Sequence, residues 1–150
     1  MTAAIANPAF ARLVGSLGSD VAAASPTSVE FILEGDVPAR LTLHPNGSEV
    51  VVDAFACDAS AFVGPVHGRV VDTLLRLNAL GLRGRFFAIG IDPHGFVAVT
   101  SRAPMADLEG GALQEFIDYV AGHARRVRDL VSTLAPPETR QSYSFVQQES

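Results

Sequence analysis

The chain has 150 residues, of which 48% are hydrophobic and 18% charged, so it can bury the core of one folded domain and is too apolar to be disordered. Its formal net charge of −5 excludes nucleic acid and an anionic membrane surface as principal partners, because both attract clustered positive charge. Cys57 is the only cysteine, which excludes an intrachain disulfide and a cysteine-based zinc site.

The first predicted element is a helix at residues 8–17. Asn7 is placed to be its N-cap and Pro8 its first helical residue. Gly18 is expected to end it. The apolar residues of this helix recur at i, i+3, i+4 and i+7 and form one stripe: Phe10, Leu13, Val14 and Leu17.

Three strands in a meander are predicted next, at residues 28–33, 39–44 and 49–56. Segments 35–38 and 44–47 separate them, and both contain the Gly, Pro or Asn residues that turns require. The first two strands alternate apolar and polar residues, which predicts one face in water. The third strand is apolar on both faces. The apolar side of the first strand carries Val29, Phe31 and Leu33.

A second helix is predicted at residues 66–80, with Gly81 as its C-cap. Its apolar band is wider than the usual stripe of about 100°, so we expect this helix to pack on two sides. One line of apolar residues contains Val66, Val70, Leu74 and Leu77. A second line contains Val71, Leu75 and Leu82.

A hairpin is predicted from strands 85–91 and 96–101 around Asp92-Pro93-His94-Gly95, which fits a type I turn. Both faces are apolar around residues 86–89. One face is expected to be ordinary core, and for the other face an interface is as well supported as further core.

The last helix is predicted from Leu108 or Glu109 to Leu134, with a sustained 3.6-residue period. Its arginines at 125, 126 and 128 are read as a solvated face offset by nearby carboxylates at 115, 118 and 129. Pro136-Pro137 stops the helix, so residues 1–135 are predicted to form the domain and 136–150 a flexible tail. The inward face of this helix is Leu113, Phe116, Ile117, Val120, Ala124, Val127, Val131 and Leu134.

This order, α-β-β-β-α-β-β-α, predicts an α+β fold in which helices pack on a twisted antiparallel sheet. No catalytic site, metal site or cofactor is predicted. The four histidines are scattered without ligand companions, and Cys57 fits a buried structural thiol better than a nucleophile. No G-x-S-x-G elbow or phosphate-binding loop is present. A small thiol enzyme is therefore the weakest hypothesis.

The apolar surface predicted for the second helix and the hairpin exceeds what one small domain can bury. A second copy of the chain, a client polypeptide, or both would cover the remainder. A cytoplasmic binding protein is expected, because no apolar run approaches the roughly 20 residues of a membrane span and the N-terminus lacks a signal-peptide pattern.

The chain resembles the class I chaperones of bacterial type III secretion. The resemblance covers residues 8–134 and lies in the element order, the acidic charge, the size and three degenerate blocks. Val127 departs from it, since relatives often carry a large aromatic there. The blocks are Leu74-Leu75-x-x-Asn78-x-x-Gly81, the Asp92-Pro93-x-Gly95 turn, and Pro104-Met105-x-x-Leu108 leading into the helix with Phe116 and Ala124-Arg125.

This resemblance implies a cytoplasmic virulence-associated homodimer that binds the N-terminal region of a secreted effector in extended form and keeps it export-competent. The export ATPase is a candidate further partner. The candidate effector-binding residues are Phe10, Leu13, Val14, Leu17, Val29, Phe31 and Leu33. The candidate dimer residues are Val70, Leu74, Leu77, Phe86 and Ala88, and Leu74→Asp is expected to break the dimer. The alternative is a non-catalytic regulatory or scaffolding module of the same fold.

Overall fold

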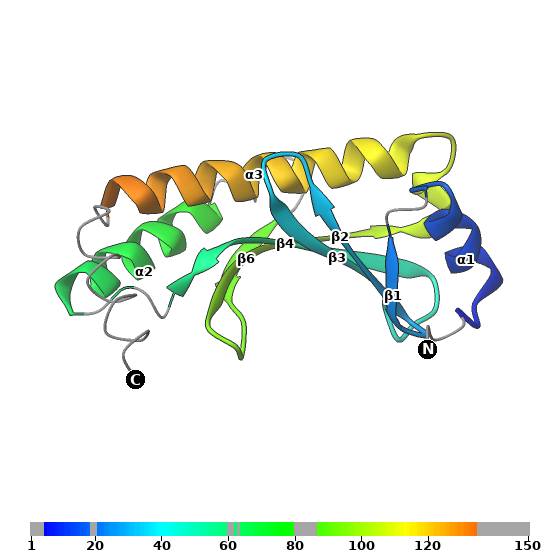
Figure 1. The fold of residues 1–150 in the computed structure, drawn as a ribbon, viewed down its shortest axis with the longest axis horizontal. Helices are drawn as coiled ribbons and strands as arrows, with labels where there is room; N and C mark the ends of the chain where they lie inside the picture. The colour runs from blue at the N-terminus through cyan, green and yellow to red at the C-terminus, as the bar shows by residue number, and fades with distance from the viewer. Residues whose placement is uncertain (1–4, 19–20, 60–61, 63, 80–86, 135–150) are drawn as a thin grey trace.

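The computed structural model contains a six-stranded sheet with the long helix α3 lying along one of its faces (Figure 1). The structure describes residues 5–18, 21–59, 62, 64–79 and 87–134. The helices are α1 (Pro8–Gly15), α2 (Pro65–Asn78), the short 3-10 helix η3 (Met105–Leu108) and α3 (Ala112–Leu134). The strands are β1 (Ala22–Ser25), β2 (Ser28–Leu33), β3 (Val37–Leu43), β4 (Glu49–Asp58), β5 (Ala88–Ile91) and β6 (Phe96–Pro104).

The sheet has the strand order β1-β2-β3-β4-β6-β5, and every neighbouring pair is antiparallel. The predicted α+β class and the β2–β3–β4 meander are therefore confirmed. Strand β1 is an addition to the predicted order. Its sequence, Ala-Ala-Ala-Ser, has neither the β-branched residues nor the alternation that mark a strand. It forms by pairing with β2, which is a tertiary effect.

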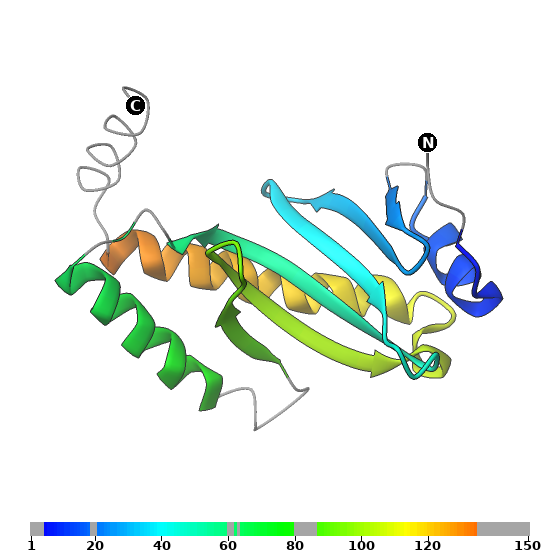
Figure 2. The ribbon, with the colours of Figure 1, turned by 90° about the horizontal axis from the view of Figure 1, so that it is seen from below.

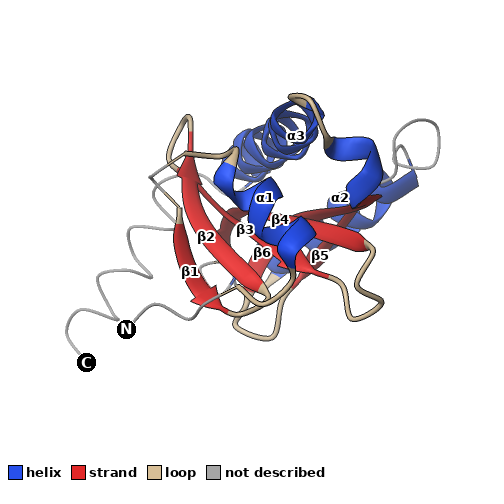
Figure 3. Ribbon diagram, turned by 90° about the vertical axis from the view of Figure 1, so that its right-hand side faces the viewer, coloured by secondary structure: helices blue, strands red, loops and turns tan. Residues whose placement is uncertain are grey.

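The helices gather on one side of this sheet (Figures 2 and 3). In Figure 2, α3 runs behind the strands, while α1 and α2 lie at opposite ends of the molecule. Helix α3 contacts β3, β4 and β6, whereas α2 contacts α3 and β5. One face of the sheet is thus covered by helices, and the other face carries the outward residues of the central strands.

The core forms between α3 and the covered face of the sheet. The predicted inward face of α3 is confirmed, since its residues from Leu113 to Val131 are buried and Leu134 packs against the same cluster. The matching residues of β4 alternate with half-buried neighbours, as expected for a strand with two different faces. These buried β4 residues are Val50, Val52, Ala54 and Ala56.

Several element ends differ from the prediction for identifiable reasons. Helix α3 begins at Ala112 instead of residue 108 or 109, because Gly110 and Gly111 adopt positive φ after η3. Helix α1 ends at Gly15, with Ser16 as its C-cap. Helix α2 ends at Asn78, and the predicted cap Gly81 lies outside the described residues, as does the 136–150 tail.

The turn between β2 and β3 is shorter than predicted. Val37 and Pro38 were expected in the turn but belong to β3, where Val37 is fully buried and pairs with Leu33. Gly35 and Asp36 make the reversal with φ of 81° and 57°. The burial of Val37 outweighs the turn preference of the proline that follows it.

Two arginines of α3 hold this turn, which corrects their interpretation as a solvated face. Arg125 Nη1 donates to the Glu34 carbonyl at 3.0 Å, and Arg128 Nη1 donates to the Gly35 carbonyl at 2.7 Å. Hydrogen bonds from a charged donor are among the stronger ones in proteins. The end of the β2–β3 hairpin is thereby fastened to the helix.

We expect Gly35→Ala to destabilise the fold more than Gly47→Ala. Both glycines have positive φ, 81° and 75°, so both substitutions carry the left-handed backbone cost of about 1–2 kcal/mol. A Cβ at Gly35 would also lie 3.2 Å from Arg125 Cδ, whereas a Cβ at Gly47 meets nothing within 4 Å. Urea unfolding measures the difference, and equal losses in the two variants would show that the contact with Arg125 is immaterial.

Candidate functional site

The seven residues predicted to bind a client divide into a buried and a half-buried set. Phe10, Leu13 and Val29 are buried in the protomer's own core. The remaining four keep part of their surface in water and pack at the edge of that core: Val14, Leu17, Phe31 and Leu33. Only the side chains of this second set keep enough solvent-accessible surface to contact a partner.

The structure also separates these residues between two hollows. Leu13 lines a hollow of about 520 Å³ between α1 and η3, together with Arg12 and Met105. Phe31 lines a different groove, also of about 520 Å³, between β2, β3 and β4. The single client groove expected from the sequence is therefore two surfaces.

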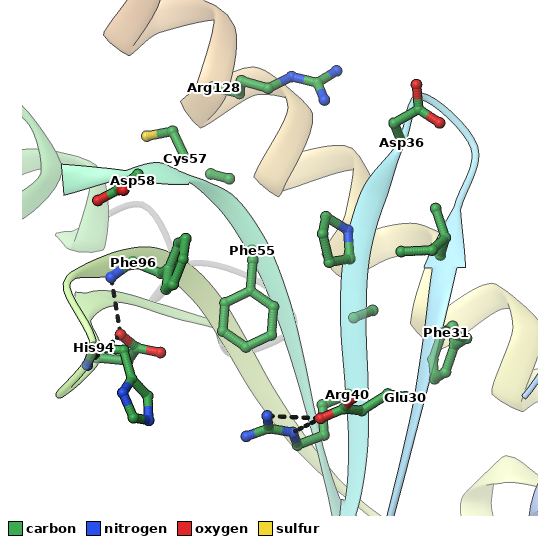
Figure 4. Close-up of a pocket in the computed structure, with 15 residues that line it drawn as sticks. Glu30, Phe31, Asp36, Arg40, Phe55, Cys57, Asp58, His94, Phe96 and Arg128 are labelled. Atoms are coloured by element: carbon green, nitrogen blue, oxygen red, sulfur yellow. Dashed lines mark hydrogen bonds and ion pairs between the residues drawn. The ribbon is translucent and has the colours of Figure 1, made fainter. Parts of the chain in front are cut away.

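The groove beside Phe31 has an aromatic floor (Figure 4). The rings of Phe55 and Phe96 meet edge to face with centroids 6.2 Å apart. The Arg40 guanidinium lies 5.8 Å from the Phe55 centroid and pairs with Glu30 at 2.9 Å. The sequence predicted that these residues lie on strands, with Phe96 in the apolar hairpin, but none of them was among the predicted client-binding residues. The outward face of a strand is known only after its neighbours are placed.

The two edge strands of the sheet differ in their exposure to pairing. On β5, the Asn78 side chain of α2 donates to the Ile89 carbonyl at 2.9 Å and accepts from the Ile89 N–H. The amide of Asn78 thus imitates a neighbouring strand and covers the β5 edge. Strand β1 ends the other side of the sheet. Among the described strands, β1 therefore offers the open edge for a further strand.

Three solved structures share this architecture. The ExsC–ExsE complex matches with a TM-score of 0.65 at 16% identity, over 83% of this chain and 92% of the matched chain. The HopA1–SchA chaperone–effector complex matches with a TM-score of 0.65 at 11% identity, over 84% and 98%. The Yersinia pestis type III secretion chaperone SycH, in complex with a fragment of YscM2, matches with a TM-score of 0.53 at 12% identity, over 81% and 98%.

The chain has a type III secretion chaperone fold. The resemblance stated from its sequence is thereby confirmed at the level of fold. No protein-family model and no curated protein matches the chain. Similarity at these identities establishes the architecture, and the partners of a protein must be argued from its own surface.

In this chaperone fold the predicted dimer residues lie deeper than expected. Val70 and Leu74 are 1% and 4% exposed and belong to the protomer's core. Leu77 and Ala88 are half-buried, and Phe86 lies outside the described residues. Val70 and Leu74 would therefore have little area left for a second copy.

The second apolar line of α2 is the one that faces outward. Leu75 is 65% exposed, and Val71, one turn earlier, is half-buried. Gly68 and Ala79 are exposed at matching positions, so the four residues recur at i, i+3, i+7 and i+11. Helix α2 was predicted to pack on two sides. In the structure one side packs in the core, and the other side faces solvent.

An aromatic cluster joins Phe87, the residue before β5, to α3. The rings of Phe87 and His123 stack with centroids 4.1 Å apart, and Tyr119 meets both rings edge-on. Burial lowers the pKa of His123 below its ordinary value, and the positive charge of Arg126 lowers that pKa further. The folded protein therefore favours the neutral imidazole.

We expect His123 to make the fold less stable in mild acid. The pKa of His123 is lower in the folded state than the unfolded value of 6.5. The contribution of the neutral imidazole to the free energy of unfolding is therefore fully present above pH 6.5 and is lost as the pH falls below that value. His123→Phe keeps an aromatic ring and cannot take up a proton. Wild type should therefore lose stability as the pH is lowered from 8 to 5.5, and this variant should not. The free energy of unfolding of His123→Phe minus that of wild type, measured by urea titration, should increase over the same change. A pH-independent difference would contradict this expectation.

The described residues contain no group of three or more His, Cys, Asp or Glu side chains that could hold a metal ion. Cys57 is half-buried and lines the groove beside Phe31, where a buried structural thiol was expected. Within the part of the chain that the structure describes, no helix is both long and apolar enough to cross a membrane.

Proposed function

We propose that the protein is a non-catalytic, homodimeric type III secretion chaperone of the bacterial cytoplasm. It binds the N-terminal region of a secreted effector in extended form. The observation that carries this proposal is the combination of the fold with an open β1 edge and half-buried apolar residues on α1. Two of the matched structures are described as chaperones in complex with an effector or a protein fragment, which supports a polypeptide partner.

The proposed client adds a strand to the β1 edge and places apolar side chains against Val14 of α1 and Leu17 in the turn that follows it. Main-chain hydrogen bonds of this kind supply affinity with little dependence on client sequence, and side-chain contacts supply the selectivity. The edge of β5 is unsuited to this role because Asn78 occupies it at Ile89.

The proposed dimer forms through the outward face of α2 centred on Leu75. A two-fold axis beside this helix would bring two copies of the same apolar stripe together. The two β1 edges would then belong to one particle, so a long client could engage both and gain from effective concentration. The export ATPase remains a candidate further partner.

Co-expression with the product of a neighbouring gene tests the client proposal. The expected result is a stable complex in which an N-terminal client fragment resists protease only when the chaperone is present. Val14→Asp should abolish this protection, while Thr133→Asp, which puts the same charge at an exposed site on α3, should preserve it. Protection that survives Val14→Asp would remove α1 from the client site. A partner that binds only as a folded domain would favour a regulatory or scaffolding module.

A further inference from the structure

The sheet opens between β3 and β4. Their pairing ends at Ala39 and Ala54, although β3 starts at Val37 and β4 continues to Asp58. From this point β3 pairs only with β2, and β4 pairs only with β6. The groove beside Phe31 occupies the place where the two strands separate (Figure 4).

The sequence explains this separation. Leu43 donates its N–H to Thr27 on the β2 side, whereas His44 donates to Glu49 on the β4 side. Because successive amides alternate between the two sides of a strand, the nitrogen of Pro38 faces β4 and has no hydrogen to donate. A bulge in β4 between Phe55 and Cys57 bends that strand at the same level. The opening is thus built into both strands.

The groove keeps apolar side chains in water. Ile32 is 66% exposed and Phe96 is 41% exposed, and the half-buried Phe55 lines the same groove. Phe31 also lines the groove, but it is the neighbour of Ile32 on β2 and so lies on the opposite face of that strand, with the buried Val29. Three large apolar side chains on the outward face of the sheet, those of Ile32, Phe55 and Phe96, therefore border a hollow of about 520 Å³ that can receive an apolar side chain of a ligand.

The charge around the groove is predominantly negative. Its lining contains four carboxylates and two guanidinium groups. Arg40 is paired with Glu30, and Arg128 is bound to the Gly35 carbonyl, so both cations already have acceptors. The carboxylate of Asp36 makes no ion pair among the described residues. A ligand that brings its own positive charge is therefore favoured over an acidic one.

We propose that this groove is a second docking site for a protein segment in extended form, one that carries a large apolar side chain beside an arginine or lysine. The proposal rests on the proposed binding of an extended polypeptide. It names a surface separate from α1 and the β1 edge, and it specifies the chemistry of the occupant.

Two synthetic peptides with the sequences SLRVRLSG and SLEVELSG test this site on the full-length, isotope-labelled protein. Backbone amide shifts in NMR spectra at low salt report where each peptide binds. We expect the basic peptide to bind at least about tenfold more tightly, as complementary charge should favour it. Its largest shifts should lie at Phe55 and Phe96.

Three variants refine the test. Phe55→Ser should weaken the basic peptide at least about tenfold, because it removes the central ring of the floor. Val51→Ser changes a half-buried residue of the same strand outside the groove and should have no effect. Asp36→Asn retains a residue that tolerates positive φ and should reduce the preference for the basic peptide.

Equal affinity for the two peptides, shifts confined to α1 and β1, no binding of either peptide, or an unchanged affinity of Phe55→Ser would each overturn the groove proposal. Groove shifts that depend on protein concentration without peptide would identify a second copy as the occupant and also overturn it. Client protection that depends on Val14 but not on Phe55 would leave the proposed function standing and remove only this site.

Discussion

Leu75→Asp should convert the proposed dimer into folded monomers, whereas Leu74→Asp should unfold the protomer. The two residues are adjacent on α2, but Leu75 is 65% exposed and Leu74 is 4% exposed. An aspartate at position 75 stays in water in the monomer and becomes an unpaired interfacial charge in the dimer, once in each protomer. We expect a loss of at least about 2 kcal/mol of dimer stability.

An aspartate at position 74 meets a different environment. It replaces a core side chain with a buried charge, and loss of a core leucine alone costs about 2–5 kcal/mol. A domain of this size has a free energy of unfolding of about 5–15 kcal/mol, so the substitution would remove most of it. From the sequence, Leu74→Asp was expected to break the dimer at its interface. Because Leu74 is buried in the protomer, loss of the dimer in this variant would not identify the interface.

Light scattering after size-exclusion chromatography, combined with circular dichroism, separates these outcomes. Arg69→Asp, an exposed change on another face of α2, is the control and should remain dimeric. A Leu75→Asp variant that stays dimeric at micromolar concentration would place the interface elsewhere. A wild-type protein that is monomeric at that concentration would remove the homodimer from the proposed function.

Asn78→Asp should destabilise the fold by about 1–3 kcal/mol, because the new carboxylate would face the Ile89 carbonyl with no hydrogen to donate. The same substitution at Asn46, whose amide donates to Glu49 at 2.8 Å in an exposed turn, is the matched control. We expect its cost to stay below about 1 kcal/mol, since exposed charges are screened by water.

Hydrogen exchange at the Ile89 amide distinguishes the two hydrogen bonds of this contact, the one donated by Asn78 and the one it accepts. Asn78→Asp keeps an acceptor for the Ile89 N–H, while Asn78→Leu removes it. Exchange at Ile89, relative to global unfolding, should therefore accelerate in the leucine variant only. Equal exchange in both variants would contradict the assigned contact. The leucine variant also uncovers the β5 edge, so it should be more prone to strand-mediated association.

The Asn78 contact explains one part of the resemblance seen in the sequence. The block Leu74-Leu75-x-x-Asn78 combines a core residue, an outward apolar residue and a side chain that binds a neighbouring strand. The sequence indicated that these positions belong together. It could not assign their separate roles, because the partner of Asn78 is Ile89, which lies eleven residues further along the chain in a different element.

Local sequence signals predicted the inward face of α3, the β2–β3–β4 meander and the turn at Asp92–Gly95. In each of these, the signal is local: a 3.6-residue repeat, an alternation, or residues suited to one turn geometry. Asp92 accepts from the His94 and Phe96 amides and Gly95 has φ of 88°, as that turn requires. The α+β class followed from the order of such elements.

Only the tertiary structure decided which apolar residues remain available to partners. Val70 and Val71, or Leu74 and Leu75, are equally apolar in the sequence. The packing of α2 against α3 and β5 buries Val70 and Leu74, leaves Val71 half-buried and leaves Leu75 exposed. The groove between β3 and β4 likewise depends on Pro38 facing β4 across the sheet. Burial is a property of both packed surfaces, so it is fixed only when distant segments of the chain meet.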